Sequence, residues 1–168
     1  QSFLPLLRAH GEPAHLMATA SVAGLVAGPG LGPYNASKFG VVAILETLHH
    51  ELAVSDPQIG VSVLCPGTVR TNITTSQRNR PENLRRIRSG DTQPPRRDDA
   101  RRRNANIAAA VAAGLDPAEV AERVADAMTE RRFWVLTHPE LTAWIRHRND
   151  QLAAGDNPTL LSDFTEGG

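Results

Sequence analysis

Cysteine, lysine and tyrosine each occur only once in this sequence of 168 residues, as Cys65, Lys38 and Tyr34. A single cysteine excludes a disulfide bond within the chain and fits a reducing compartment, so we expect a cytoplasmic protein. We interpret Cys65 as a small buried hydrophobic residue and not as a nucleophile. The other 17 of the 18 basic side chains are arginines. A lone lysine among them suggests a position at which an ammonium group in particular is required.

Long hydrophobic runs are missing as well. No apolar stretch approaches the ~20 residues of a membrane-spanning helix, and the first residues, QSFLPLLRAHGEP, lack the basic and apolar regions of a signal peptide. The formal net charge is zero, which provides no overall attraction to nucleic acid or to an anionic membrane. We therefore expect no nucleic-acid partner and no membrane partner. With 40% hydrophobic residues, a chain of this length is expected to fold around one core.

The sequence contains two incomplete versions of known ligand-binding motifs. The pair His50-Glu51 begins like the zinc motif H-E-x-x-H, but Val54 stands where the second histidine belongs. The glycine-rich stretch at 28–33, GPGLGP, has Pro33 at the third glycine position of the dinucleotide motif G-x-G-x-x-G. We therefore predict no metal site, and we interpret 28–33 as a flexible connection between a strand and a helix.

The residues with reactive side chains lie between Ser21 and Lys38. In the helix that the pattern predicts from Pro33 to about Ser55, Tyr34 and Lys38 are four residues apart and share one face. A nearby cation favours the ionised phenolate of a tyrosine, which a proton donor or acceptor working near neutral pH requires. Ser21 follows the apolar run 16–20, which predicts a parallel strand. Its hydroxyl is then expected at the carboxyl end of that strand, where ligands bind in open α/β sheets.

Three motifs in this order resemble the short-chain dehydrogenase/reductase family. They are Ser21, then Tyr34-Asn35-Ala36-Ser37-Lys38 as a Tyr-x-x-x-Lys motif, then Pro66-Gly67-Thr68-Val69-Arg70-Thr71 as a Pro-Gly-x-Val-x-Thr motif. The resemblance runs from about residue 3 to about residue 150, and its specific motifs lie within 14–73. It implies an α/β fold with a Rossmann-like, doubly wound parallel sheet. It also implies hydride transfer between NAD or NADP and a small-molecule alcohol or carbonyl substrate.

The resemblance further implies a role for each motif residue. Tyr34 would exchange a proton with the substrate oxygen, and Ser21 would hydrogen-bond that oxygen. Lys38 would stabilise the phenolate and, together with Tyr34, contact the ribose of the nicotinamide. Because proline cannot continue a central ladder and glycine permits close backbone approach, the Pro66-Gly67 turn itself indicates a place where a ligand meets the main chain. The resemblance implies nicotinamide contacts at Pro66, Gly67, Val69 and Thr71.

The start of the chain suggests an incomplete fold. Its first residue is glutamine, and its first motif residue is Ser21. The family's glycine-rich pyrophosphate turn and a further catalytic asparagine have no counterpart in this sequence. We therefore expect only the second half of the doubly wound sheet, with residues 1–155 as the C-terminal portion of one domain. Two functions stay open: part of a working oxidoreductase, or a truncated, inactive relative that acts as a binding or interaction module.

The helix predicted at 34–55 has two stripes of small or apolar residues. One stripe faces its own sheet, and the other is available to a second subunit, so we expect a homo-oligomer that associates through this helix. The first stripe comprises Val41, Leu45, Leu48 and Leu52, and the second comprises Ala36, Gly40, Ala43 and Thr47.

The most irregular part of the sequence is residues 74–106. It contains three prolines and shows no apolar period, and residues 70–103 carry 11 basic and 4 acidic groups, a net charge of +7. We predict a loop or partly disordered arginine-rich flap, which is either a solvated, mobile segment or a lid over the substrate. No aromatic residue is present there for base stacking, which argues against a nucleic-acid site. Beyond it we predict a helix starting at Asp116, a strand at 133–136, a helix from Pro139 and a polar tail at 156–168.

Overall fold

A computed structural model of the chain describes residues 3–81 and 97–160. The chain forms two compact units. Of the described residues, the first unit contains 3–67 and 118–160, and the second contains 68–81 and 97–117.

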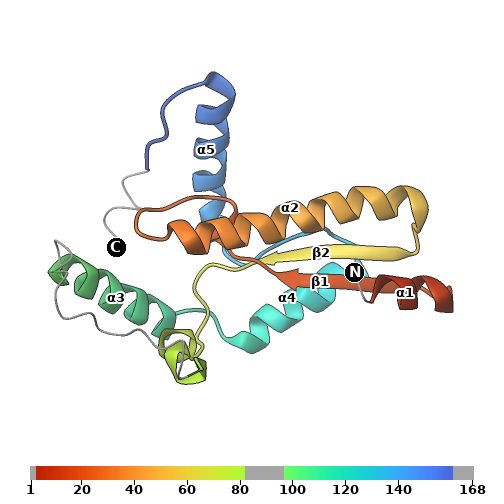
Figure 1. Cartoon of the computed structure of the whole chain (residues 1–168), viewed down its shortest axis with the longest axis horizontal. Coiled ribbons are helices and arrows are strands. Elements are labelled where there is room, and N and C mark those ends of the chain that lie inside the picture. Colours follow the sequence, from red (N-terminus) through yellow and green to blue (C-terminus); the bar gives the residue numbers. More distant parts are fainter. Residues whose placement is uncertain (1–2, 82–96, 161–168) are drawn as a thin grey trace. The chain divides into compact units, whose positions relative to one another are not determined.

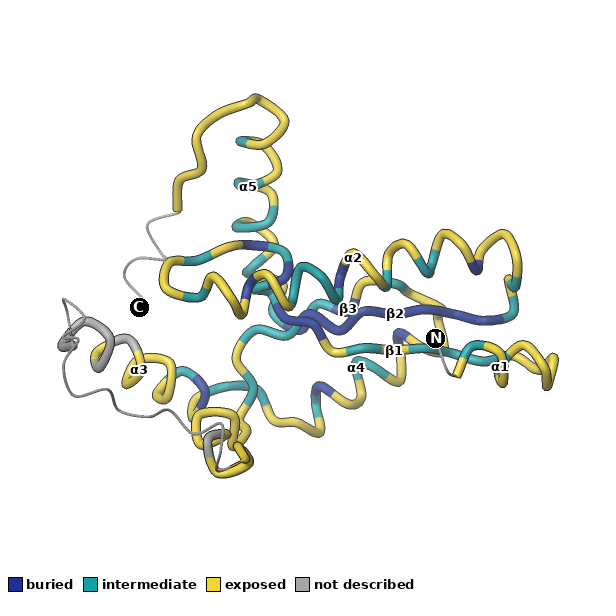
Figure 2. Tube along the Cα trace, viewed as in Figure 1, coloured by how far each residue is buried: buried dark blue, intermediate teal, exposed yellow. Residues whose placement is uncertain are grey.

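The first unit is built on a sheet of three parallel strands (Figure 1). These are β1 (Ala14–Thr19), β2 (Ile59–Cys65) and β3 (Trp134–Leu136), in the order β1-β2-β3. The pairing of β1 with β2 runs from Ala14↔Ile59 to Thr19↔Leu64, and that of β2 with β3 from Val63↔Trp134 to Cys65↔Leu136. Every residue of β2 is buried (Figure 2). Such a strand lacks polar alternation because both of its faces are covered.

Helices lie on both sides of this sheet (Figure 1). Helix α2 (Gly32–Ser55) runs along one side and α4 (Pro117–Thr129) along the other, while α1 (Leu4–His10) precedes β1 and α5 (Thr142–Ala154) follows β3. The long helix predicted from residue 33 to 55 is confirmed, with a proline in its first two positions. The predicted strand at 133–136 and the helix beginning after Asp116 are also confirmed.

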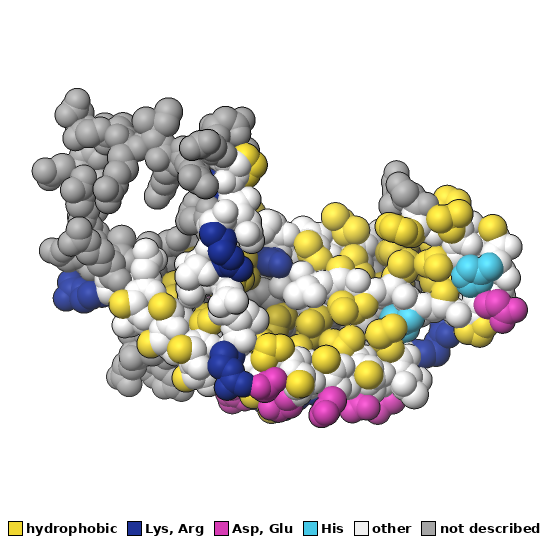
Figure 3. Space-filling model, turned by 90° about the horizontal axis from the view of Figure 1, so that it is seen from below, with side chains coloured by type: hydrophobic (Ala, Val, Ile, Leu, Met, Phe, Trp, Pro, Cys, Tyr) yellow, Lys and Arg dark blue, Asp and Glu magenta, His cyan; other side chains and the backbone are white. Residues whose placement is uncertain are grey.

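Helix α2 contributes most of the side chains that cover the sheet. Val42 joins Ala20, Val63 and Cys65 in one buried cluster, and Leu52 joins Ile59 and Val61 in another. Leu45 packs against both clusters, as the first predicted stripe requires. On the second stripe, Ala36, Ala43 and Thr47 are exposed. Viewed from below, the molecule carries further hydrophobic side chains at its surface (Figure 3), and the exposed ones of the first unit include Phe3, Leu6 and Met17.

The second unit contains η2 (Ile73–Asn79) and helix α3 (Arg97–Ala112). Its backbone is joined by an isolated parallel bridge between Val69 and Leu115, and Arg70 forms an ion pair with Asp116. The prediction of a loop over 74–106 is wrong for its last part, because α3 starts at Arg97. Arginine and alanine are good helix formers, and the three prolines at 81, 94 and 95 all precede this helix. The central part of the predicted flap, 82–96, lies outside the described residues.

The last described helix ends at a glycine. Helix α5 ends at Gly155, which has φ +75°, a left-handed conformation that glycine adopts without strain. Residues 156–160 of the predicted polar tail are exposed and form neither helix nor strand, and 161–168 lie outside the described residues. None of the helices in the described part of the chain is long and apolar enough to cross a membrane.

Candidate active site

Two predicted site residues, Ser21 and Pro66, lie just beyond the carboxyl ends of strands in the first unit. Ser21 follows β1 and Pro66 follows β2, and Thr137, which was not predicted, follows β3. Hydrogen bonds join these strand ends beyond the sheet. The Val22 N–H donates to the Pro66 carbonyl oxygen at 3.0 Å, and the Gly67 N–H points toward Thr137 Oγ1 at 3.3 Å. The edge of the sheet at which ligands bind in α/β proteins is therefore held together on both sides of the Pro66-Gly67 turn.

Ser21 caps the short helix η1 (Val22–Gly24). Its backbone is extended, and its Oγ accepts a hydrogen bond from the Ala23 N–H at 3.1 Å. The same hydroxyl lies 3.5 Å from the Pro66 carbonyl oxygen, at the long limit of a hydrogen bond. The Ser21 side chain is thus oriented by a firm bond that it accepts. Its proton remains able to turn toward a stronger acceptor.

Tyr34 and Lys38 lie together in the first turns of α2. The Lys38 Nζ is 5.7 Å from the centre of the Tyr34 ring, as expected for residues four apart on a helix. The ammonium donates to the Thr19 carbonyl oxygen at 3.1 Å, at the end of β1. This bond brings the cation to the strand end that precedes Ser21. Tyr34 is 39% exposed, so its ring is accessible to a ligand.

Gly24 sets how closely the Ser21 turn packs against α2. A Cβ at this position would lie 2.7 Å from the Lys38 carbonyl oxygen and 3.1 Å from Val42 Cγ2. Sequence reasoning missed this residue, although a glycine three positions after Ser21, in a turn between a strand and a helix, is a usable signal. Asn35, also buried, fastens the preceding loop through its Nδ2 bond to the Gly28 carbonyl oxygen at 3.2 Å.

The glycine of the Pro66-Gly67 turn is required by a contact within the protein. A Cβ on Gly67 would lie 2.8 Å from Cγ and Nδ1 of His138 and 3.0 Å from Leu141 Cδ1. The His138 ring thus covers one side of the turn, and the predicted contact of a ligand with Gly67 stays a prediction. His138 and Thr137 were not predicted, since their contacts with Gly67 span 71 and 70 residues of sequence.

The other two predicted cofactor contacts belong to the second unit. Val69 forms the bridge with Leu115, and Thr71 Oγ1 accepts a hydrogen bond from the Ile73 N–H at 3.4 Å. Thr71 is exposed. Of the four positions in the Pro-Gly-x-Val-x-Thr motif, Pro66 and Gly67 thus lie with the Ser21, Tyr34 and Lys38 group in the first unit, whereas the remaining two lie in the second.

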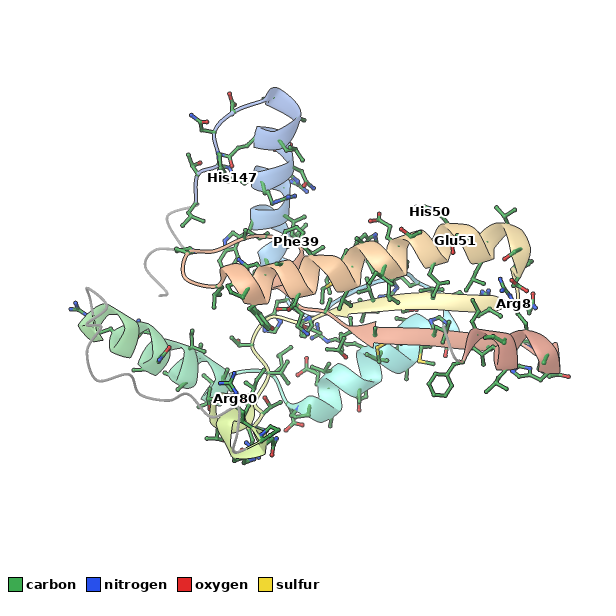
Figure 4. All side chains as sticks on the ribbon, in the orientation of Figure 1. Arg8, Phe39, His50, Glu51, Arg80 and His147 are labelled. Atoms are coloured by element: carbon green, nitrogen blue, oxygen red, sulfur yellow. The ribbon has the colours of Figure 1, made fainter. Side chains whose placement is uncertain are left out.

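Cys65 is buried in the core beneath the site, as predicted. Burial raises the pKa of its thiol to about 11, against smaller opposing effects of a hydrogen bond with the Ser21 backbone and of the Lys38 charge. A thiol in this state is not a nucleophile near neutral pH. Across residues 3–81 and 97–160, no three His, Cys, Asp or Glu side chains are grouped so that they could hold a metal ion. His50 and Glu51 lie toward the far end of α2 (Figure 4).

An apolar pocket of about 560 Å³ lies in the first unit beside α2, β3 and α5. The Arg148 guanidinium lies over the Phe39 ring at 5.1 Å from its centre, and both residues line the pocket. Phe39 is labelled in Figure 4. The pocket has the size and apolar character of small-molecule sites. Its hydrophobic lining residues include Leu25, Phe39, Val42, Trp134, Leu136 and Ile145.

Comparison with known proteins gives matches to dehydrogenases and reductases. Residues 1–82 match the family model described as short chain dehydrogenase. A "CLA biosynthesis dehydrogenase/reductase" of Lactiplantibacillus plantarum is 30% identical over 158 residues, 94% of this chain and 54% of the relative. A 1-deoxy-11-beta-hydroxypentalenate dehydrogenase of Streptomyces exfoliatus is 42% identical over 71 residues, 42% of this chain and 25% of the relative.

Solved structures give the same result. A short-chain dehydrogenase/reductase from Burkholderia phymatum, in complex with NAD, is 41% identical and superposes with a TM-score of 0.84. The alignment covers 94% of this chain and 54% of that one. The chain thus spans about half the length of this protein and of the Lactiplantibacillus relative.

These matches correct one prediction and confirm another. The expectation that the chain holds only the second, C-terminal half of the fold is wrong. The family model matches residues 1–82, the N-terminal half of this chain, which contains β1, α2 and β2 of the parallel sheet. That expectation rested on motifs missing before Ser21, and a missing motif is a weaker signal than an aligned segment. The family itself is confirmed, and it is the one that the three motifs predicted, the short-chain dehydrogenases/reductases.

Proposed function

We propose that the protein containing this chain is an NAD(P)-dependent oxidoreductase that interconverts an alcohol and a carbonyl compound. The observation that carries the proposal is the position of the Lys38 ammonium, bound to the Thr19 carbonyl oxygen at 3.1 Å and 5.7 Å from the Tyr34 ring centre. It puts a phenol and a fixed cation together near the carboxyl end of a parallel strand. The confirmed family and the NAD in the similar Burkholderia phymatum structure support the same function.

Three side chains would carry the proton chemistry. Tyr34 exchanges a proton with the substrate oxygen, and Lys38 stabilises the phenolate that results when Tyr34 has given its proton away. Ser21 donates a hydrogen bond to the substrate oxygen, and this bond replaces its long contact with the Pro66 carbonyl oxygen. Because Ser21 is held by the Ala23 N–H, it makes this exchange without losing its orientation.

The residues fit the ribose of a nicotinamide nucleotide. The Lys38 ammonium has three N–H donors and gives one to Thr19, and the Tyr34 hydroxyl both donates and accepts. Hydride transfer is the chemistry that a bound NAD or NADP supplies. Pro66, Gly67, Val69 and Thr71 are proposed as further contacts on the nicotinamide side. The substrate is proposed to be a small-molecule alcohol or carbonyl compound.

Steady-state kinetics of Tyr34→Phe test the proposal. We expect turnover to fall by at least about 100-fold because the transferable proton is lost, while the affinity for the nicotinamide nucleotide changes by less than a few-fold. Glu51→Gln, a conservative change at an exposed residue of the same helix, is the control and should retain turnover. Normal turnover in Tyr34→Phe would remove this tyrosine from the mechanism. Nucleotide binding by wild-type protein without turnover of any alcohol or carbonyl compound would favour an inactive binding protein.

We also propose that the protein forms a homo-oligomer through α2. The exposed small side chains of Ala36, Ala43 and Thr47 allow another helix to approach closely. Light scattering on wild type and on Ala43→Arg tests this, since a large charged side chain in the stripe should convert the oligomer to a monomer. An unchanged mass would show that association, if present, uses another surface.

A further inference from the structure

The amide of Gly67 is held by two acceptors from the end of β3. Its nitrogen lies 3.3 Å from Thr137 Oγ1 and 3.2 Å from His138 Nδ1, and these two atoms are hydrogen-bonded to each other at 2.6 Å. Thr137 is almost completely buried, with 1% of its surface exposed. The amide is therefore shared between two side chains at a partly buried position, where losing a hydrogen bond has a cost.

The ring of His138 also fills the space beside Gly67. Its Cγ and Nδ1 lie only 2.8 Å from the position that a Cβ on residue 67 would have. The ring therefore limits how far the turn can move toward β3, and its nitrogen supplies the acceptor. In the tautomer that carries its proton on Nε2, Nδ1 is an acceptor for the Gly67 N–H and for the Thr137 hydroxyl.

The other side of the turn is fixed independently. The Pro66 carbonyl oxygen accepts from the Val22 N–H at 3.0 Å and lies 3.5 Å from the Ser21 hydroxyl. The Pro66 carbonyl is thus directed toward the end of β1 and the Gly67 amide toward the end of β3. A peptide unit held at both of these groups has little freedom to rotate.

Helix α4 supports the β3 side in turn. Arg123 donates from Nη1 to the Thr137 carbonyl oxygen at 2.6 Å, and its other guanidinium nitrogen pairs with Glu119 one turn earlier. The backbone that presents Thr137 and His138 is therefore held by a charge-assisted hydrogen bond. The support under Gly67 extends from the turn, through β3, to α4.

We propose that His138, assisted by Thr137, is a positioning residue that fixes the Pro66-Gly67 turn for binding of the nicotinamide nucleotide. The inference rests on the proposed function, since it concerns the nucleotide that this function requires. His138 acts through Gly67 and does not itself contact the nucleotide. Its acceptor nitrogen keeps the turn in the conformation that the nucleotide meets, so its loss affects nucleotide binding more than the proton chemistry of Tyr34.

Two substitutions at His138 separate the acceptor from the bulk of the ring. His138→Phe keeps a ring against Gly67 but has no acceptor, whereas His138→Asn has no ring but can place Oδ1 near the position of Nδ1. In His138→Phe we expect the KM and Kd for NAD(H) or NADP(H) to rise by about 5- to 15-fold, as for the loss of one hydrogen bond, with kcat changed by less than about threefold. His138→Asn should return the KM to within about threefold of wild type. Thr137→Val should also raise the KM, because either variant leaves the amide with only one of its two acceptors.

Hydrogen exchange at the Gly67 amide gives a readout that does not depend on activity. It should be faster in His138→Phe than in wild type and close to wild type in His138→Asn, measured without nucleotide. Thermal unfolding of each variant identifies any that fail to fold, and in that case Thr137→Val alone must show the faster exchange and the higher KM. Equal impairment of His138→Phe and His138→Asn, or an unchanged KM in both, would overturn the positioning role while Tyr34→Phe still tests the chemistry. A wild-type protein that binds neither NAD(H) nor NADP(H) would overturn the proposed function, and this inference with it.

Discussion

The Lys38 carbonyl oxygen lies beside Gly24 at a distance that leaves no room for a side chain, since a Cβ there would approach it to 2.7 Å. The turn that carries Ser21 therefore packs directly on the backbone of the helix that carries Tyr34 and Lys38. The relative position of the proposed catalytic groups therefore depends on a residue that has no side chain.

Gly24→Ala tests this packing. The new methyl group must displace either η1 or α2, so we expect the free energy of unfolding to fall by about 1–3 kcal/mol and turnover to fall with it. Gly32→Ala is the matched control, because no described atom lies within 4 Å of a Cβ at that position, and it should leave stability within about 1 kcal/mol. Urea unfolding of both variants measures the difference. Equal stabilities would mean that η1 moves away from α2 at no cost.

Lys38→Arg retains the charge and changes its geometry. A guanidinium is planar and its stem differs from that of lysine, so it cannot reproduce both the bond to the Thr19 carbonyl oxygen and the position beside the Tyr34 ring. We expect turnover to fall by at least about tenfold, and Lys38→Met, without any charge, to be impaired at least as much. Kinetics of the two variants beside wild type decide the matter. Wild-type turnover in Lys38→Arg would show that any cation suffices.

Cys65 should resist thiol reagents in the folded protein. Because burial raises the pKa of this thiol to about 11, only about 0.1% is ionised at pH 8, and the core also excludes the reagent. We expect labelling with a chromogenic disulfide at least about 100-fold slower than that of a cysteine in an unfolded peptide. In concentrated urea the same thiol should react fully. Rapid labelling of the native protein would place Cys65 outside the core.

His15 should make stability depend on pH. Burial, and then the charge of Arg131, lower the pKa of this imidazole below its ordinary value of 6.5, and its Nε2 lies 2.7 Å from Ser62 Oγ. Below pH 6.5 the unfolded chain therefore binds more protons at His15 than the folded chain does. The contribution of His15 to the free energy of unfolding is complete above this pH and is lost as the pH falls. Between pH 7.5 and pH 5.5 the free energy of unfolding should decline more in wild type than in His15→Gln. Parallel declines would assign the pH dependence to other groups.

Local pattern explains what could be predicted from this sequence. The pairing of Tyr34 with Lys38 follows from helical spacing, and the helix over 33–55 follows from its apolar stripe and its initial proline. The burial of Cys65 follows from its place at the end of a strand without polar alternation. Each of these inferences needs only a few neighbouring residues.

Contacts between distant residues explain what could not be predicted. The His138 and Thr137 contacts with Gly67 join segments about 70 residues apart, and no periodic pattern in the sequence predicts them. The helix at Arg97–Ala112 was missed because a high density of arginine was interpreted as a loop signal, although arginine is compatible with helix. The prediction of a second half-sheet failed because it was drawn from motifs that were absent and not from residues that are present.

The contact between His138 and Gly67 also constrains how this protein can vary in evolution. Any side chain at position 67 would lie under 3 Å from the imidazole of His138. A substitution of Gly67 is therefore acceptable only after His138 has been replaced by a smaller residue. The two positions are therefore expected to change as a pair among natural sequences, in that order. A lineage that keeps the histidine must keep the glycine, whereas one that has lost the histidine need only move the end of the Leu141 side chain, which lies 3.0 Å from a Cβ at position 67.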